Sequence, residues 1–332
     1  MKLYDIAVVG ASGLVGRKIL EVLEERKFPC GRITAIASDK SYGREITVNR
    51  KNYKLQMLTP EIFKNSEFAF FSAGAAISHE YAPAAVKERA VVIDNSSAFR
   101  MNDDVPLIVP EVNRQEIFKH RGIISNPNCS TIQLVMVLSP LDKKFRIKRV
   151  VVSTYQSVTG KGNRGITQLQ REIAKQPLEI EPAFPHVIAY NAIPHVDVFL
   201  DNGYTKEEFK VIHETRKILS NYDINLTVTC VRVPTIGGHC ESVNIEFERK
   251  AAAEGIRDIL SNTKGIKVVD EPQNNNYPMP IDSLDKDDVF VGRIRKDDSV
   301  RNGINLWIVS DNVRKGAATN AVQIAEELIK GK

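Results

Sequence analysis

The N-terminal segment constrains the fold of this chain more than any other feature. A short apolar run, Tyr4–Val9, leads directly into a glycine-rich turn, Gly10–Gly16, and then into an amphipathic pattern that reaches Arg26. The three glycines of this GxxGxxG turn allow a tight bend and bring peptide N–H groups towards an anion at a helix N-terminus. A strand, turn and helix in this order predict the first unit of a dinucleotide-binding fold, although a tight turn without a ligand would need similar residues.

Short apolar runs and helical patterns continue to alternate after this first unit. The segments expected to form buried strands are Tyr4–Val9, Ile33–Ala37, Phe68–Ser72, Val91–Ile93 and Ile123–Ile124. The segments expected to form amphipathic helices are Gly13–Arg26 and Ile77–Glu88. This alternation predicts a Rossmann-like α/β domain, with a parallel sheet and helices on both of its faces.

The pattern changes after Leu141, where apolar residues recur at every second position. The longer strands expected here are Arg149–Val158, Asn225–Val233, Glu241–Glu248 and Ile304–Ser310. Alternation of this kind predicts an open, mixed sheet with one buried face. Thr205 followed by Glu208 forms a capping-box motif that opens a helix to Leu219, and a last helix covers Lys315–Lys330.

These patterns predict two domains. We expect a dinucleotide-binding domain over residues 1–130, with a C-terminal helix at about 313–332 packing back on it. We expect an α+β catalytic domain over residues 131–312.

The composition excludes several classes of protein. The chain has 332 residues, 42% of them hydrophobic, and a net charge of +5 without long basic blocks, so we expect no nucleic-acid partner. No apolar run reaches the roughly 18 residues of a membrane span, and no signal peptide is expected. The four cysteines are scattered without zinc-ligand spacing, which predicts no metal site and a reduced, cytoplasmic setting.

One cysteine has a distinctive context, Asn126-Pro127-Asn128-Cys129-Ser130-Thr131. Asn128 is a good helix N-cap, which would place Cys129 in the first turn of the following helix. The helix dipole and the exposed N–H groups stabilise a thiolate there. Cys129 is therefore a candidate nucleophile, whereas Cys30, Cys230 and Cys240 fit the ordinary role of small buried hydrophobes.

Several residues are candidates to assist such a thiol. His239 follows two glycines in a segment expected to be a loop, and it competes with His195 for the role of proton acceptor. Arg232 ends an otherwise apolar strand face and needs an anionic partner, which could be a ligand or a buried salt bridge. Glu207 and Lys210 share one face of a helix, where such a pair is ordinarily solvated surface.

The loop after the second strand bears on cofactor choice. Ser38-Asp39-Lys40-Ser41 lies at the position where an acid would bind the adenine ribose of NAD and a base would bind the 2′-phosphate of NADP. Both an acid and a base are present, so spacing alone leaves the choice open.

Together these motifs resemble the aspartate-β-semialdehyde dehydrogenase family. The matching segments follow in order through nearly the whole chain: Gly10–Gly16, Asp94–Arg100, Asn126–Thr131, Tyr155–Gly160, Arg232 with His239, and Asp311–Asn312 with Lys315–Ala318. The resemblance implies reduction of β-aspartyl phosphate to aspartate semialdehyde with NADPH and release of inorganic phosphate. This reaction serves the biosynthesis of lysine and diaminopimelate, threonine, methionine and isoleucine.

The resemblance also implies roles for individual residues. Cys129 would form a thioester, His239 would be the acid/base and Gln156 would orient the intermediate. The substrate α-carboxylate would bind to Arg232 and its amino group to Glu207. The residues implied to hold the phosphate are Arg100, Lys210 and Asn128. The residues implied to line the NADP cofactor are Gly10, Ser12, Gly13, Leu14, Val15, Ser38, Lys40, Ser41, Thr159, Gly160 and Asn312.

The chain departs from the family pattern at two positions. Lys40, beside Asp39, replaces the usual arginine of the 2′-phosphate loop, and Cys240 stands where serine is more common after the histidine. The family further implies that the second domain is a dimerisation domain and that the protein is a homodimer or a tetramer built from dimers.

Two other families and one non-enzymatic role are alternatives. N-acetyl-glutamyl-phosphate reductase shares the thiol and the histidine, but it usually has a glycine where this chain has Asn128. Glyceraldehyde-3-phosphate dehydrogenase has a different motif around its nucleophile. A non-catalytic NADP-binding sensor of the same fold would be expected to lose the cysteine or the histidine, and both are present.

Overall fold

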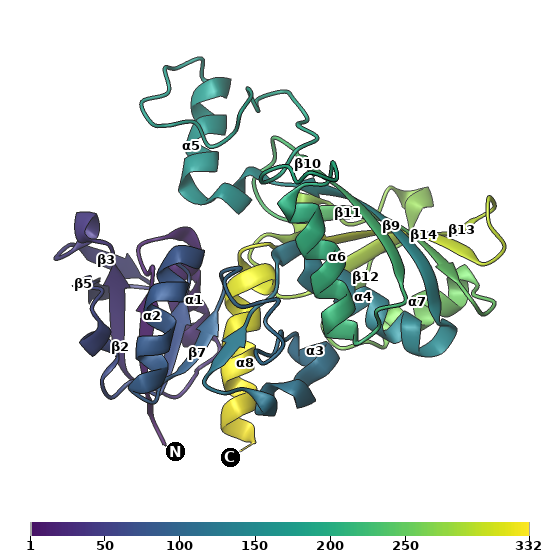
Figure 1. Cartoon of the computed structure of the whole chain (residues 1–332). Coiled ribbons are helices and arrows are strands. Elements are labelled where there is room, and N and C mark those ends of the chain that lie inside the picture. The colour runs from purple at the N-terminus through teal and green to yellow at the C-terminus, as the bar shows by residue number, and fades with distance from the viewer. Residues whose placement is uncertain (1, 332) are drawn as a thin grey trace. The chain divides into compact units, whose positions relative to one another are not determined.

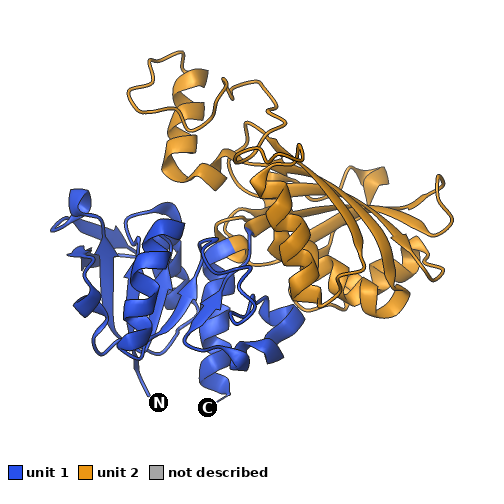
Figure 2. Ribbon diagram, in the orientation of Figure 1, with its two compact units in different colours: residues 1–128, 317–332 blue, residues 129–316 orange. Residues whose placement is uncertain are grey.

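The computed structural model divides the chain into two compact units, which are coloured separately in Figure 2. Unit 1 is Met1–Asn128 with Ala317–Lys332, and unit 2 is Cys129–Gly316. The structure describes residues 2–331. Within these residues, no helix has both the length and the apolar character needed to cross a membrane.

Unit 1 is built on a sheet of six parallel strands (Figure 1). The strands are β1 (Tyr4–Val9), β2 (Cys30–Ala37), β5 (Gln56–Met57), β6 (Phe68–Phe71), β7 (Val91–Asp94) and β8 (Ile123–Ser125). Their order across the sheet is β5-β2-β1-β6-β7-β8, which is the 3-2-1-4-5-6 order of a doubly wound dinucleotide-binding sheet. In that fold, ligands bind where the strand order reverses, beyond the carboxyl ends of β1 and β6.

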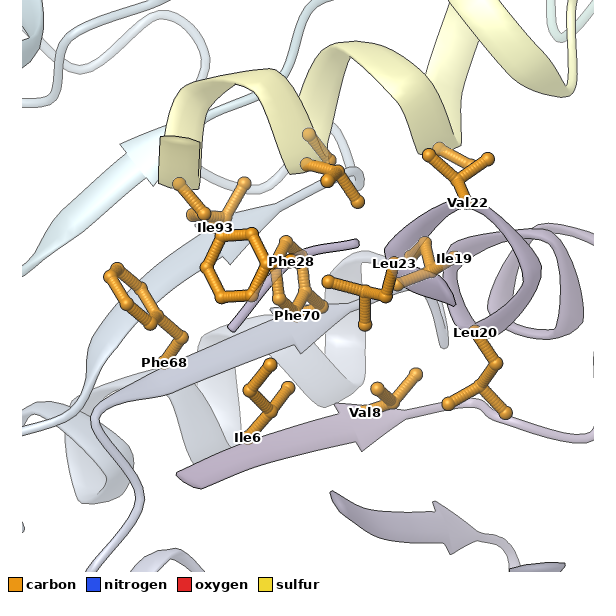
Figure 3. Close-up of a cluster of buried hydrophobic side chains, with 14 of the residues drawn as sticks. Ile6, Val8, Ile19, Leu20, Val22, Leu23, Phe28, Phe68, Phe70 and Ile93 are labelled. Atoms are coloured by element: carbon orange, nitrogen blue, oxygen red, sulfur yellow. The ribbon is translucent and has the colours of Figure 1, made fainter. Parts of the chain in front are cut away.

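Helices cover both faces of this sheet. The principal helices are α1 (Leu14–Glu25), α2 (Ala75–Lys87) and α8 (Thr319–Lys330), with a short α3 (Pro110–Asn113). Figure 3 shows Val22 and Leu23 of α1, Phe70 of β6 and Ile93 of β7 in one apolar cluster, to which α8 also contributes. α2 instead contributes Ala82 and Ala85 to the cluster on the other face. The last helix of the chain therefore completes the core of the first unit.

Unit 2 is built on a mixed sheet. Its strands are β9 (Ile147–Gln156), β10 (Asn225–Arg232), β11 (His239–Phe247), β12 (Ile266–Val268), β13 (Val289–Asp297) and β14 (Gly303–Ser310). Across the sheet they run β10-β9-β11-β14-β13-β12, with parallel pairing only at β9–β10 and β12–β13. The helices are α4 (Cys129–Phe145), α5 (Gly162–Ile173), α6 (Lys206–Leu219) and α7 (Ala253–Ser261). α4 contacts β9, β11 and β14, and it also packs against α6 and α7.

The expected fold class, a parallel Rossmann-like domain followed by an α+β domain with a mixed sheet, is confirmed. The capping box at Thr205 is also present, because its side chain accepts from the Glu208 amide while the Glu208 carboxylate accepts from the Thr205 amide. Several boundaries differ from expectation, two of them near the candidate site residues. β9 ends at Gln156, since a 3₁₀ turn begins at Val158, and α8 is preceded by a π-helical turn at Arg314–Ala318.

The hairpin of β3 (Glu45–Val48) and β4 (Lys51–Lys54) was not predicted from the sequence. β4 is largely charged and exposed, and β3 has only two buried apolar residues, Ile46 and Val48, so the pair is too short to show the apolar pattern that marked the other strands. Their connection is made by Asn49 and Arg50, which both adopt positive φ angles, of 47° and 64°. Such angles suit a two-residue hairpin turn.

The apolar cluster of unit 1 predicts a large stability cost when its aromatic centre is removed. Phe70 is 0% exposed, so Phe70→Ala should lower the free energy of unfolding by about 3–5 kcal/mol. The matched change Tyr222→Ala removes a ring that is 69% exposed, and it should change stability by no more than about 0.5 kcal/mol. Urea unfolding followed by circular dichroism measures both, and similar losses in the two variants would contradict this account of the core.

Candidate active site

Cys129 occupies the first position of α4, as the sequence predicted. It is partly exposed, whereas the ten residues after it, Ser130–Ser139, are all buried. Gly316 lies against it, because a Cβ added at Gly316 would approach the Cβ of Cys129 to 2.9 Å. The thiol therefore combines a helix N-terminus with access to solvent, the two conditions that make a cysteine reactive. The role of Asn128 as N-cap remains a prediction.

The other three cysteines have the properties of packing residues. None of the four forms a disulfide. Burial raises the pKa of Cys30 to about 11 and that of Cys240 to about 12, and it raises the pKa of Cys230 well above its usual value. Their thiols stay protonated near neutral pH, so Cys129 is the best placed of the four to act as a nucleophile.

The carboxyl ends of β9 and β10 and the start of β11 bring three candidate residues into one row. Arg232 is the register partner of Gln156, and Cys240 is the partner of Tyr155, which places His239 beside Gln156. Arg232, Gln156 and His239 are each no more than 3% exposed. Residues directly opposite one another on neighbouring strands share a face, so these three residues lie on one face of the sheet.

His239 is the first residue of β11, and this corrects the expectation that it lies in a loop. The glycines before it do form the bend, with Gly237 at a φ of 120°. Strand pairing extends to His239 because its register partner on β14 is Ser310. Burial and the nearby Arg232 lower the pKa of His239 to about 3. His195, its competitor, instead stacks on the ring of Phe199 at a centroid distance of 4.4 Å.

Arg232 has no carboxylate partner among residues 2–331. Its Nη1 donates to the backbone oxygen of Ser157 at 2.7 Å, and its guanidinium lies 5.7 Å from the ring centroid of Phe184. Burial lowers the pKa of Arg232, while Glu207 and Cys129 act in the opposite direction. A buried guanidinium without a carboxylate is costly unless an anionic ligand completes it. The internal salt bridge that the sequence left open is absent from the described residues.

Glu207 and Lys210 share one face of α6, as expected, but they are not ordinary solvated surface. Glu207 is 7% exposed and accepts from Gln156 Nε2 at 3.1 Å. Lys210 Nζ donates to Glu207 at 3.1 Å and to Asp197 at 2.6 Å. Burial alone would lower the pKa of Lys210, but the two carboxylates outweigh it and raise that pKa. Gln156, Glu207, Lys210 and Asp197 thus form one hydrogen-bonded chain.

A second buried carboxyl lies two residues further from the carboxyl end of β9. Glu241 is the register partner of Thr154 and is 0% exposed. Neither of its side-chain oxygens has a hydrogen-bond partner among the described residues. Burial raises the pKa of Glu241 to about 8, with Gln133 of α4 opposing the shift, so the carboxyl is mostly protonated at neutral pH.

The glycine turn of unit 1 has the tight geometry that a phosphate-binding loop requires. Gly10 has a φ of 83°, and a Cβ added there would lie 2.9 Å from the backbone oxygen of Ser72 at the end of β6. A Cβ at Gly16 would lie 2.1 Å from the backbone oxygen of Gly10. Gly13 is the N-cap of α1 and provides no side-chain cap. A dinucleotide pyrophosphate fits this site, because backbone N–H groups at the helix start remain to bind it.

The loop expected to select the cofactor follows β2 in unit 1. Ser38 and Lys40 are exposed, and Ser41 is half-buried in a 3₁₀ turn over Asp39–Ser41. Neither Lys40 nor Asp39 forms a salt bridge with any described residue. The ammonium of Lys40 therefore stays available to an anionic ligand.

The predicted site residues fall on both units. Unit 1 carries Gly10, Ser12, Gly13, Leu14, Val15, Ser38, Lys40, Ser41, Arg100 and Asn128. Unit 2 carries Cys129, Gln156, Thr159, Gly160, Glu207, Lys210, Arg232, His239 and Asn312. Within unit 1, Arg100 Nη2 donates to the backbone oxygen of Asn95 at 2.8 Å. Within unit 2, Thr159 Oγ1 donates to Asn312 Oδ1 at 2.8 Å, so two residues expected at the cofactor are held together.

Sequence reasoning did not single out Ser157, Asp197, Glu241 or Gly316. Ser157 and Gly316 lay inside matched motifs, but their individual roles depend on partners distant in sequence. Asp197 contacts Lys210 across 13 positions, and Ser157 contacts His239 across 82. The only local signal was an acidic residue, Glu241, on the otherwise apolar face of a strand that also carries Val243 and Ile245.

Two family models match the chain. The model described as "Semialdehyde dehydrogenase, NAD binding domain" matches residues 5–120, and "Semialdehyde dehydrogenase, dimerisation domain" matches residues 138–315. The aspartate-semialdehyde dehydrogenase of Aquifex aeolicus is 52% identical over 98% of both chains. That of Bacillus subtilis is 48% identical over 98% of this chain and 97% of the relative. The chain belongs to the aspartate-semialdehyde dehydrogenase family.

Solved structures of the family have the same fold. Aspartate semialdehyde dehydrogenase II of Vibrio cholerae, complexed with ASA, superposes with a TM-score of 0.94 at 44% identity, covering 99% of each chain. The Candida albicans enzyme, solved with NADP, has a TM-score of 0.76 at 25% identity over 98% of each chain. This member of the family is therefore an oxidoreductase with a nicotinamide-cofactor domain.

The buried Glu241 predicts a specific dependence of stability on pH. Its folded pKa of about 8 lies above the ordinary value of 4.5, so between these two pH values the folded state holds a proton that the unfolded state has released. This group therefore costs about 1.4 kcal/mol of stability for each unit of rising pH in that window. Glu241→Gln should gain stability over wild type progressively from pH 5 to pH 8.

The control for this prediction is Glu246→Gln on the same strand, where the carboxylate is half-buried and paired with Lys148 at 2.7 Å. That variant should show a small stability change that is nearly constant over the same range. Urea unfolding at a series of pH values measures both variants. A difference between Glu241→Gln and wild type that does not grow with pH would contradict the buried neutral carboxyl.

Proposed function

We propose that the chain is an NADP-dependent aspartate-semialdehyde dehydrogenase that converts L-β-aspartyl phosphate to L-aspartate 4-semialdehyde through a thioester on Cys129. One observation in unit 2 gives the proposal its main support. In unit 2 the Cys129 thiol, at a helix N-terminus, interacts electrostatically with the buried guanidinium of Arg232, which has no carboxylate partner among residues 2–331. A nucleophile and a carboxylate clamp are the two elements that an amino-acid acyl phosphate requires.

The chemistry explains why a thiol is used. A thioester accepts hydride readily whereas a carboxylate does not, so covalent catalysis converts one difficult reduction into two easier steps. Attack by the Cys129 sulfur on the acyl carbon expels phosphate and leaves the aspartyl group on the enzyme. Gln156, which is 1% exposed and fixed by Glu207, orients this thioester.

Separate charged groups bind the two ends of the substrate. Arg232 binds the α-carboxylate, for which its planar fork is suited. Glu207 binds the α-amino group. Lys210, with Arg100 and Asn128, binds the phosphate, and the contact between Lys210 and Asp197 keeps its ammonium charged and in place.

The cofactor residues fit a dinucleotide. The turn at Gly10–Gly16 binds the pyrophosphate, and a bound reduced nicotinamide supplies the hydride. Lys40, with Ser38 and Ser41, binds a 2′-phosphate, which makes NADP the cofactor. The Candida albicans relative, whose structure contains NADP, supports this choice.

We further infer that the enzyme self-associates as a homodimer or a dimer of dimers, because residues 138–315 match the dimerisation domain of the family. The product would serve the biosynthesis of lysine and diaminopimelate, threonine, methionine and isoleucine.

The reaction is tested most directly in reverse, as phosphate-dependent reduction of NADP⁺ by aspartate semialdehyde. N-acetylglutamate semialdehyde is the control substrate and should give no comparable rate, because an acetylated amino group cannot pair with Glu207. Cys129→Ala should abolish turnover and leave cofactor binding intact. Intact-mass analysis of wild type with acyl phosphate but no reductant should show an adduct on the Cys129 peptide, and near-normal turnover by Cys129→Ala would exclude the covalent mechanism.

Lys40 allows a separate test of cofactor choice. Lys40→Ala should lose a charge-assisted contact of about 1.5–3 kcal/mol, or roughly ten- to a hundredfold in NADP affinity. NAD affinity should hardly change, because NAD has no 2′-phosphate. KM values for both cofactors in wild type and variant decide the matter. Equal losses for NAD and NADP, or a wild type that prefers NAD, would overturn this role of Lys40.

A further inference from the structure

A buried carboxylate lies at the carboxyl end of β7 in unit 1. Asp94 is the last residue of that strand and is 0% exposed. Its Oδ1 accepts from the Ser78 hydroxyl at 2.8 Å and from the Ser96 amide at 2.9 Å, while its Oδ2 accepts from the Ser96 hydroxyl at 2.8 Å. Among residues 2–331 it forms no salt bridge. Hydrogen-bond donors, rather than a cation, therefore compensate for its burial.

Two neighbours of this carboxylate explain how a charge can be buried there. Ser78 is the fourth residue of α2, so Asp94 lies near the N-terminal, positive end of that helix dipole. The Ser96 hydroxyl accepts from the Ala98 amide at 3.1 Å, so its single proton is given to Asp94. Hydrogen bonds to an ionised acceptor are roughly twice as strong as neutral ones. Asp94 therefore fixes the groups bonded to it more firmly than a neutral side chain would.

The main group that Asp94 fixes is loop 95–100, directly after β7. No part of this loop belongs to a helix or strand, so local contacts decide its position. Asn95 donates to the backbone oxygen of Phe71, at the end of β6, from its amide at 2.9 Å and from Nδ2 at 3.1 Å. Ser96 is held by the Asp94 carboxylate through two hydrogen bonds. The loop is thus attached to the carboxyl ends of two neighbouring strands.

Arg100, at the end of this loop, is bonded to its beginning. Arg100 is 7% exposed, and its Nη2 donates to the backbone oxygen of Asn95 at 2.8 Å. That oxygen and the Ser96 N–H, which donates to Asp94, belong to the same planar peptide group. Asp94 and Arg100 therefore hold opposite sides of one rigid unit. The carboxylate sets the orientation of the carbonyl that the guanidinium binds.

Asp94 is also connected to the second residue of unit 1 that is proposed to bind phosphate. Its backbone oxygen accepts from the Asn126 amide at 2.8 Å, two residues before Asn128. A guanidinium presents five N–H donors in a fixed fork, so Arg100 can bind Asn95 and an anionic ligand together. Short hydrogen-bonded paths therefore join Asp94 to both proposed phosphate ligands of this unit, and only the path to Arg100 runs through the carboxylate.

We propose that Asp94 is a positioning residue of the phosphate subsite: its carboxylate orients the Asn95–Ser96 peptide, and this peptide orients Arg100 towards the phosphate. The inference rests on the proposed function and gives a role to a residue that the family resemblance left without one. Asp94 is fully buried and acts through Arg100 without touching the substrate. The position requires a carboxylate, because each of the three groups bonded to it is a donor.

Asp94→Asn tests the need for a carboxylate. The amide keeps the shape of the side chain but places an NH₂ group at one oxygen position, so one of the donors loses its acceptor. In the phosphate-dependent reduction of NADP⁺, the KM for phosphate should rise roughly tenfold, because a misplaced binding group can cost up to about a hundredfold. The KM values for aspartate semialdehyde and NADP⁺ should stay within about twofold of wild type. A purely structural role would lower the amount of folded enzyme and leave all three KM values unchanged.

Asp5→Asn is the matched control. Asp5 lies near the amino end of β1 in the same sheet, and it also accepts from a backbone amide, that of Arg32, at 2.7 Å. This change should leave every KM value unaffected, since the amino ends of parallel strands lie at the opposite end of the sheet from loop 95–100. Equal KM values for phosphate in Asp94→Asn and Asp5→Asn would overturn the inference.

A double-mutant cycle shows whether Asp94 acts through Arg100. Arg100→Ala should lower kcat/KM for phosphate by itself, because it removes the proposed phosphate ligand. If Asp94 acts by orienting Arg100, adding Asp94→Asn to Arg100→Ala should lower kcat/KM further by no more than about twofold. Full multiplication of the two single effects would show independent roles and would contradict the proposal.

Ser96→Ala provides a second variant if circular dichroism shows that Asp94→Asn does not fold. It removes one of the two hydrogen bonds by which Asp94 holds the loop, so the KM for phosphate should rise by roughly fivefold. A folded Ser96→Ala variant with the phosphate KM of wild type would refute the positioning role. Failure of the proposed function is distinguishable, because the wild type would then show no phosphate-dependent turnover of aspartate semialdehyde, and the positioning role would fall with it.

Discussion

The candidate active site depends on the two backbone hydrogen bonds of a single residue, Ser157. Its oxygen accepts from Arg232 at 2.7 Å and its N–H donates to His239 at 3.1 Å. β10 and β11, which carry these two side chains, flank β9, and Ser157 directly follows the end of that central strand. The N–H and the C=O of Ser157 belong to two consecutive planar peptide groups, which have no side-chain torsions, so they hold both side chains without the entropy loss of ordering another side chain. The positions of Arg232 and His239 are thus coupled through sheet register.

Glycines provide the space that these held groups need. Gly160 leaves room beside Arg232 and His239, and Gly316 leaves room beside Cys129. In unit 1, Gly10 and Gly16 let the backbone of the turn approach itself and the end of β6 closely. In both units the absence of a side chain at these glycines leaves space that a Cβ would fill, and in unit 2 the side chains beside that space are polar.

The sequence predicted the features that depend on neighbours along the chain. Apolar periodicity marked most strands of both sheets, and local helix signals placed Cys129 in the first turn of α4 and the capping box at Thr205. The features that it missed depend on register between distant segments. Whether His239 lies in a loop or a strand is decided by pairing with Ser310, and whether Glu207 and Lys210 are solvated is decided by Asp197 and Gln156. Periodicity identifies the face of a strand but carries no information about what lies opposite.

Burial favours the neutral form of two titratable groups in unit 2, His239 and Glu241. It keeps His239 without a second proton and Glu241 with its proton, so both are neutral near pH 7. Arg232 has no neutral form accessible at that pH and remains a cation. Glu207, as a carboxylate, is matched by Lys210. An ionised Glu241, two residues along β11 from His239, would add negative charge to the same buried region and would oppose both a thiolate at Cys129 and an anionic substrate. Because the folded protein retains the proton on Glu241, its stability falls as the pH rises towards 8. The same proton keeps negative charge out of this buried region, which favours an anionic substrate and an anionic nucleophile there.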